Sequence, residues 1–91
     1  MAKRTVKQYT SMKEPKEFNE TLAGTYQAVG TLELRHGAGT RSQMLAVLPA
    51  MAVKCKGRFT REAGVRWLYV EAIEKNSRYC GFCAAGKLKK I

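Results

Sequence analysis

Three cysteines and one histidine are the residues of this sequence whose side chains bind metals most readily. Cys80 and Cys83 form a Cys-x-x-Cys motif, which supplies half of a typical structural zinc site. Cys55 and His36 would complete a Cys₃His set, although neither has a second ligand close to it in the sequence. Because this spacing specifies a metal only loosely, we expect no cofactor and buried, apolar thiols at Cys55 and one of the pair, with zinc as the alternative. A thioredoxin-like redox role is a weaker alternative, because the motif lies near the C-terminus of the sequence.

A row of cations beside aromatic side chains is the second chemically informative feature. Lys54, Lys56 and Arg58 alternate with less polar residues, so an extended strand would place all three on one side. Trp67 and Tyr69 follow in the next alternating run. Cations attract phosphate groups and aromatic rings stack with unpaired bases, which is the combination that single-stranded nucleic-acid binders use.

These residues lie on two runs, 52–60 and 65–73, which we expect to pair as an antiparallel hairpin. Gly64 can close either a three-residue or a four-residue loop. Pairing of Thr60 with Val65 would place both aromatic rings beside the cations. A slip of one residue would turn both rings into the core, where a lone tryptophan is found more often. The cations stay exposed in both registers.

The charge of the chain favours polyanionic partners. Its 91 residues carry 17 Lys+Arg against 7 acids, a net charge of +10, and all the acids are glutamate. One histidine, no aspartate and no nucleophile beside a recognisable base predict a non-enzymatic protein.

We therefore expect a nucleic-acid-binding module whose partner is a nucleic acid or a ribonucleoprotein. The alternative is a small basic interaction protein, a ribonucleoprotein subunit or a phage-type inhibitor, that docks on a larger acidic or nucleoprotein partner. An exposed strand edge would allow oligomers. The candidate binding residues are hairpin residues and two N-terminal cations: Lys54, Lys56, Arg58, Arg61, Arg66, Trp67, Tyr69, Lys3 and Arg4.

The cysteine count and the N-terminal residues indicate a reducing, cytoplasmic setting. Three cysteines are an odd number, unlike a secreted disulfide scaffold, and no apolar leader segment follows Met1. The longest apolar run, 44–53, is about half as long as a membrane span, so we expect no membrane partner.

The remaining elements must position the hairpin. Residues 1–13 carry cations and no acid, and we expect a basic arm, or an edge strand once docked, before one small globular domain over 14–91. Residues 14–24 predict a short helix, because Pro15 suits a first helical position and Gly24 suits the residue that ends a helix.

Alternation predicts a strand over 25–35, with a bulge or a close backbone approach at Gly30. A capping-box pattern predicts two turns of helix over 41–47, with a strand over 44–48 as the alternative. Residues 78–84 are expected to add a third antiparallel strand. Together these elements predict an α+β fold, a small antiparallel sheet of three to four strands with one or two short helices on one face. A small β-barrel is the alternative if 44–48 is a strand.

Overall fold

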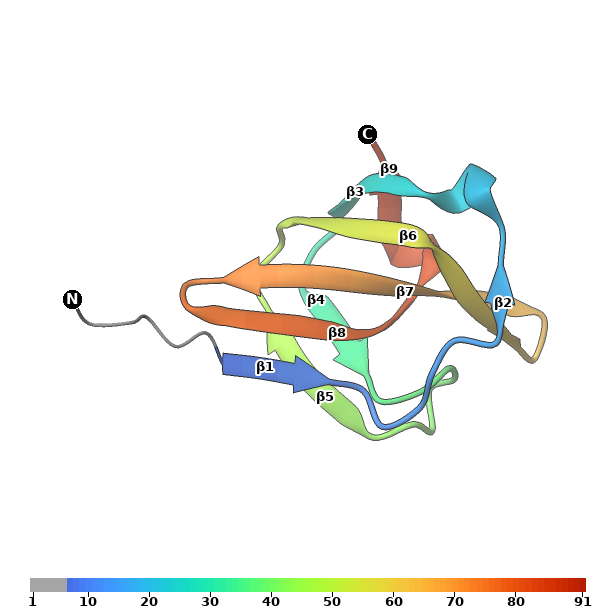
Figure 1. Cartoon of the computed structure of the whole chain (residues 1–91), viewed down its shortest axis with the longest axis horizontal. Coiled ribbons are helices and arrows are strands. Elements are labelled where there is room, and N and C mark those ends of the chain that lie inside the picture. Colours follow the sequence, from blue (N-terminus) through green and yellow to red (C-terminus); the bar gives the residue numbers. More distant parts are fainter. Residues whose placement is uncertain (1–6) are drawn as a thin grey trace.

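The computed structural model describes residues 7–91, which form an all-β structure (Figure 1). Within this range nine strands make a single open antiparallel sheet, with no α-helix and only two 3-10 turns. The predicted α+β fold is therefore wrong. The alternative of a small barrel is also wrong, because the sheet is not closed. Within the same residues there is no helix long and apolar enough to span a bilayer.

The strands follow one another across the sheet in the order β5-β4-β8-β7-β6-β3-β9. In that order they are β5 (Met44–Leu48), β4 (Leu32–Arg35), β8 (Ser77–Ala84), β7 (Val65–Glu74), β6 (Ala52–Glu62), β3 (Gly24–Ala28) and β9 (Leu88–Lys90). Two short strands lie outside this order and pair with strands within it. They are β1 (Lys7–Thr10), which pairs in parallel with β8, and β2 (Glu17–Phe18), which pairs with β6. The 3-10 turns are η1 (Glu20–Leu22) and η2 (Ala85–Lys87).

The centre of the sheet is the meander of β6, β7 and β8, as the sequence predicted for the hairpin and its third strand. Next to the turn neither expected register is right, because Glu62 pairs with Val65 and only Ala63 and Gly64 form the turn. Farther along, Lys54 pairs with Glu71 and Cys55 with Val70, as the pairing of Thr60 with Val65 would give. Both turn residues have positive φ, 52° and 76°, as a type I′ turn requires. The tighter turn was not expected because it places an alanine in the left-handed region, which costs energy.

Pairing between β6 and β7 shifts in the middle of the two strands. Cys55 lies opposite Val70 and Phe59 lies opposite Leu68, so more residues on β6 than on β7 separate the two pairs. Tyr69 alone therefore faces the intervening part of β6. This is a β-bulge, which bends the strand and redirects its side chains.

Gly57 lies inside the bulge and is required there for two reasons. Its φ of +93° disfavours any residue with a Cβ. A Cβ placed on it would also lie 2.8 Å from the carbonyl oxygen of Asn19, whose amide donates to the Gly57 carbonyl. The bulge thus holds the segment that leads into η1 against β6.

Both predicted helices are replaced by extended chain. Within 14–24, Glu17 and Phe18 pair with β6 and only the short η1 is helical, because strand pairing outweighs local helix propensity. Within 41–47 the alternative strand is confirmed, since β5 pairs with β4 and buries Leu48. The strand expected over 25–35 exists as two strands, separated near Gly30, whose φ is 81°.

The main core lies on one face of the sheet and takes side chains from β3 through β9. The alternating apolar residues of 25–35, Tyr26, Ala28, Leu32 and Leu34, are all buried there. The cluster consists of Tyr26, Ala28, Leu32, Leu34, Leu48, Val53, Cys55, Phe59, Leu68, Val70, Ala72, Cys83 and Leu88. We call the opposite face of the central meander the outer face. It carries Lys54, Arg58, Trp67, Tyr69, Glu71, Arg78, Cys80 and Phe82, none of which belongs to this cluster.

Candidate functional site

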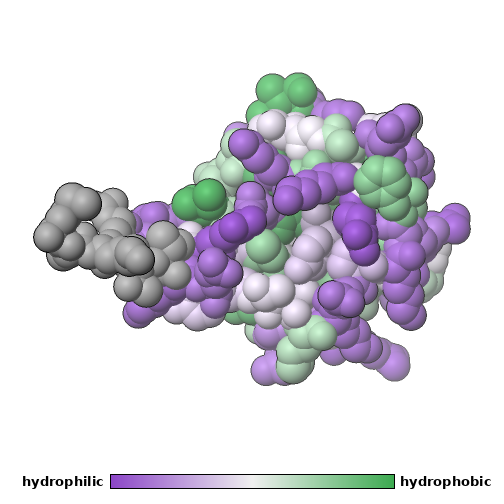
Figure 2. Space-filling model, in the orientation of Figure 1, coloured by the Kyte–Doolittle hydropathy of each residue, from purple (hydrophilic) through white to green (hydrophobic). Residues whose placement is uncertain are grey.

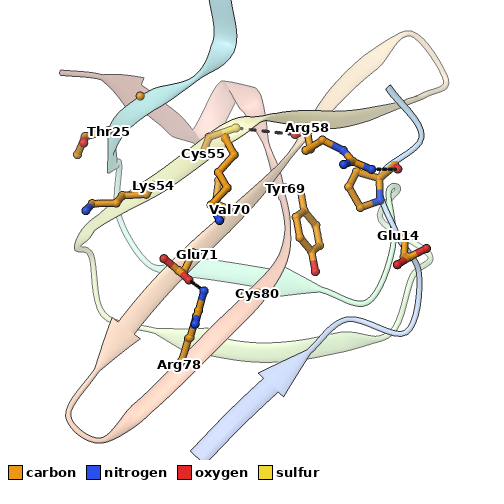
Figure 3. A pocket seen from close by; sticks show the side chains of 13 residues that line it. Glu14, Thr25, Lys54, Cys55, Arg58, Tyr69, Val70, Glu71, Arg78 and Cys80 are labelled. Atoms are coloured by element: carbon orange, nitrogen blue, oxygen red, sulfur yellow. Dashed lines mark hydrogen bonds and ion pairs between the residues drawn. The ribbon is translucent and has the colours of Figure 1, made fainter. Parts of the chain in front are cut away.

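A groove with a cavity volume of about 440 Å³ lies on the outer face (Figure 3). Strands β6, β7 and β8 contribute Lys54, Cys55, Lys56, Arg58, Tyr69, Val70, Glu71, Arg78 and Cys80. Glu14 and Pro15, from the segment before β2, line one side, and Gly24 and Thr25 of β3 line the other (Figure 3). Figure 2 shows hydrophilic side chains spread over this view of the molecule, with paler surface between them.

The alternation of β6 determines which of its side chains reach the groove. Lys54, Lys56 and Arg58 are exposed, whereas Val53 before them and Cys55 between the two lysines are buried in the main core. All three cations line the groove. The structure thus brings these three sequence-predicted residues together on one strand.

Tyr69 lies in the middle of the groove, opposite the bulge of β6 (Figure 3). Its ring is half-buried and meets the ring of Phe82 edge to face, with centroids 5.1 Å apart and planes at 64°. Phe82 is almost fully buried and therefore supports the Tyr69 ring from the neighbouring strand. Such aromatic pairs fix ring orientation and add stability beyond their buried area.

An ion pair between Glu71 and Arg78 spans β7 and β8 within the groove. Glu71 also lies directly opposite Lys54 on β6, so one carboxylate stands between two cations. The Arg78 Nε atom is buried and has no hydrogen-bond partner among the described residues. In total the groove holds four cations against two carboxylates, the second being that of Glu14, so its net charge is positive.

The segment before β2 is held in place by hydrogen bonds from both sides. The amides of Met12 and Lys13 donate to Nδ1 and to the carbonyl oxygen of His36, each at 3.0 Å. The amide of Lys16 donates to Thr60 Oγ1 at 3.0 Å. In addition, Arg58 Nη2 donates to the Pro15 carbonyl at 3.3 Å, which fixes a cation at the wall of the groove (Figure 3).

Trp67 does not line the groove, which corrects the expected pair of stacking aromatics. It pairs with Thr60 and Ala84, and only 6% of its surface is exposed. Beside it lies a second, separate cavity, which Trp67 lines together with Gly39 and Thr40. The ring is covered by protein, so Tyr69 is the aromatic residue that remains for the groove.

Two other predicted cations on the hairpin lie away from the groove. Arg61 forms an exposed ion pair with Glu17 at 3.0 Å. The guanidinium of Arg66 lies over the ring of Phe59, 5.8 Å from its centroid. Lys3 and Arg4, the two predicted N-terminal contacts, lie outside the described residues.

The residues of the predicted zinc set are dispersed. Cys55 and Cys83 are buried in the main core, and Cys80 lines the groove on the outer face. His36 accepts a hydrogen bond from the Met12 amide through its Nδ1 atom. Within residues 7–91 no three histidine, cysteine or acidic side chains gather as a metal site would require. Burial raises the pKa of Cys83 to about 11 and also raises the pKa of Cys55, which keeps both thiols protonated at neutral pH.

Sequence reasoning missed several residues of the groove. Glu71 and Arg78 could have been found from the two-residue period of the strands. Glu71 lies two residues after Tyr69 on β7, and Arg78 lies two residues before Cys80 on β8. Glu14 gave no such signal, since it lies in the predicted helix, outside the alternating runs. Comparison of the chain with protein-family models, with curated proteins and with solved structures finds no match in any of the three.

Proposed function

We propose that the protein binds nucleic acid in the groove, with phosphate groups on the exposed cations of β6, and that it does so without catalysis. The observation that carries the proposal is the row of Lys54, Lys56 and Arg58 along one wall of a concave site. Within residues 7–91, the ion pairs with glutamate are formed by other cations, Arg61, Arg78 and Lys87. A concave site with a net positive charge attracts phosphate groups.

The strength of binding should depend steeply on salt. Three phosphate contacts release counterions, which predicts a loss of affinity of about 20- to 40-fold between 50 and 200 mM salt. The test is a titration of fluorescently labelled DNA and RNA with the wild-type protein over this range. Absence of binding to both, or binding that does not weaken with salt, would refute the proposal.

A matched pair of variants tests the location. The groove variant replaces Lys54, Lys56 and Arg58 with glutamate. The control variant replaces three exposed cations outside the groove with glutamate as well, and so changes the net charge equally. These cations are Arg41, Lys75 and Lys89. We expect the groove variant to lose at least about 100-fold in affinity and the control variant to lose far less, since only the former removes contacts. Equal losses would show that net charge, rather than the groove, governs binding.

A second candidate function is supported by the edge of the sheet. The strand β5 ends the sheet, carries no charged residue and exposes Met44 and Val47. Such an edge can accept a strand from a larger acidic or nucleoprotein partner. This function predicts a complex that survives nuclease digestion and that is lost in Val47→Lys but kept in the groove variant. The opposite pattern would favour nucleic-acid binding.

A further inference from the structure

We infer that the groove selects single-stranded nucleic acid, because Tyr69 offers a ring against which one unpaired base can lie. This inference rests on the proposed function and adds the class of nucleic acid. The phosphate groups on either side of that base would be held by Lys54, Lys56 and Arg58, which line the same groove as Tyr69.

The position of the ring is the first argument. Tyr69 is half-buried rather than buried, and it lines the groove together with the cations of β6 and the Glu71–Arg78 pair (Figure 3). Phe82 packs against it from the sheet, so the ring is held in place before any ligand binds. A ring that is already ordered loses little conformational entropy when a base stacks on it.

The bulge of β6 is the second argument. Tyr69 lies opposite an expanded part of β6 whose middle residue, Gly57, has no side chain and packs toward Asn19. The two cations that flank this glycine, Lys56 and Arg58, both line the groove. The Arg58 guanidinium is anchored by the Pro15 carbonyl, and a planar guanidinium is a second surface that unpaired bases use.

The size of the site is the third argument. A cavity of about 440 Å³ is in the range that encloses a group of small-molecule size, such as one nucleotide. In a duplex the bases are paired and stacked inside, and only the phosphate backbone and the base edges face the protein. A duplex could therefore contact the cations but could not bring a base face to Tyr69.

The test uses two labelled DNA strands of equal length, about 12 nucleotides, which is within the site size of small single-strand-binding domains. One has a mixed sequence, and the other has abasic sugars throughout with the same phosphate groups. We expect the wild-type protein to bind the base-containing strand about tenfold more tightly, because each stacked base adds to affinity. It should also prefer the mixed-sequence strand to the duplex of that sequence.

Variants assign the preference to one ring. Tyr69→Leu should abolish the preference for bases, whereas Tyr69→Phe should keep it, and thermal unfolding would check that both variants fold. The matched control is Tyr9→Leu, because Tyr9 is a partly exposed tyrosine on β1 outside the groove. Loss of the preference in Tyr69→Leu alone supports the inference. A preference that persists in Tyr69→Leu overturns it.

The two proposals fail in different ways. If the wild-type protein binds the abasic and base-containing strands equally, the groove binds phosphate groups alone and this inference is overturned, while the proposed function stands. If the protein binds neither strand, the proposed function itself is refuted.

Discussion

Glu71 of β7 forms an ion pair with Arg78 of β8 inside the groove. A carboxylate in this position lowers the positive potential around Arg78 and around Lys54, which lies opposite it. Under the proposed function, the pair would compete with a phosphate group of the ligand for Arg78.

Glu71→Gln should bind nucleic acid more tightly, by about two- to tenfold, because one more cation becomes available for a phosphate. The same change should destabilise the fold by about 1 kcal/mol, since Arg78 is partly buried and loses its partner. Binding titrations and urea denaturation measure the two effects. Glu33→Gln is the matched control, because it removes an ion pair with Lys87 that lies outside the groove. Equal gains in affinity for the two variants would show that only net charge matters.

Gly57→Ala should destabilise the protein by about 2–4 kcal/mol, because it combines a strained φ with a clash against backbone. Gly64→Ala is the comparison, since Gly64 also has a positive φ, 76°, but a Cβ there would meet nothing within 4 Å. That variant should lose only about 1 kcal/mol, the cost of the left-handed conformation. Chemical denaturation provides both values. If the two variants lose equal stability, the contact with Asn19 has no energetic weight.

Trp67 should fluoresce as a buried indole, because only 6% of its surface is exposed. We expect emission at short wavelength and little quenching by iodide in the folded protein, and both properties should change on unfolding. Strong iodide quenching of the native state would mean that the ring is accessible, and the stacking surface would then have to include Trp67.

Stability should fall as the pH rises from 9 to 11, owing to the Cys83 thiol. Burial raises its pKa from 9.0 to about 11. Within that window the unfolded chain releases the thiol proton while the folded chain retains it, so ionisation favours unfolding. The full loss would be about 2–3 kcal/mol at pH 11. Cys83→Ala should show a smaller decline over the same window, and urea denaturation of both proteins at a series of pH values measures the difference. Parallel curves would contradict the assignment to Cys83.

The parts of the fold that sequence predicted are those with a strict two-residue period. The alternation around Lys54 and Lys56 identified β6 and its exposed side, and the same period identified β7 and β8. The exposed side of β6 follows from this period in either hairpin register, whereas the face that Trp67 and Tyr69 share depends on the register.

The helices were mispredicted because local signals favoured them and distant pairing did not show in the sequence. Pro15 and Gly24 are typical of helix ends, yet Glu17 and Phe18 between them pair with β6. The residues next to Glu17 do not reveal this partner, because β6 lies more than one element farther along the chain. Tertiary pairing outweighs weak helix propensity in such short segments.

The candidate site could be predicted only in part, because pairing between distant segments does not show in the local sequence. The three cations of β6 were found, whereas Glu14 reaches the groove from the segment before β2 and Thr25 through the pairing of β3 with β6. Trp67 illustrates the limit of alternation, since it shares the outer face with Tyr69 but is buried and does not line the groove.

The parallel pairing of β1 with β8 has a consequence for the order of folding. It joins Lys7 to Ser77, from opposite ends of the chain, whereas β6, β7 and β8 are neighbours in sequence. Closing a long loop costs more entropy than forming a hairpin, so we expect the meander to form first and β1 to dock late. The segment after β1 supplies Glu14 and Pro15 to the groove, so the groove becomes complete only in this last step. Hydrogen exchange should then be fastest in β1 and slowest in β7, and transient detachment of β1 would open the groove while the rest of the sheet stays folded.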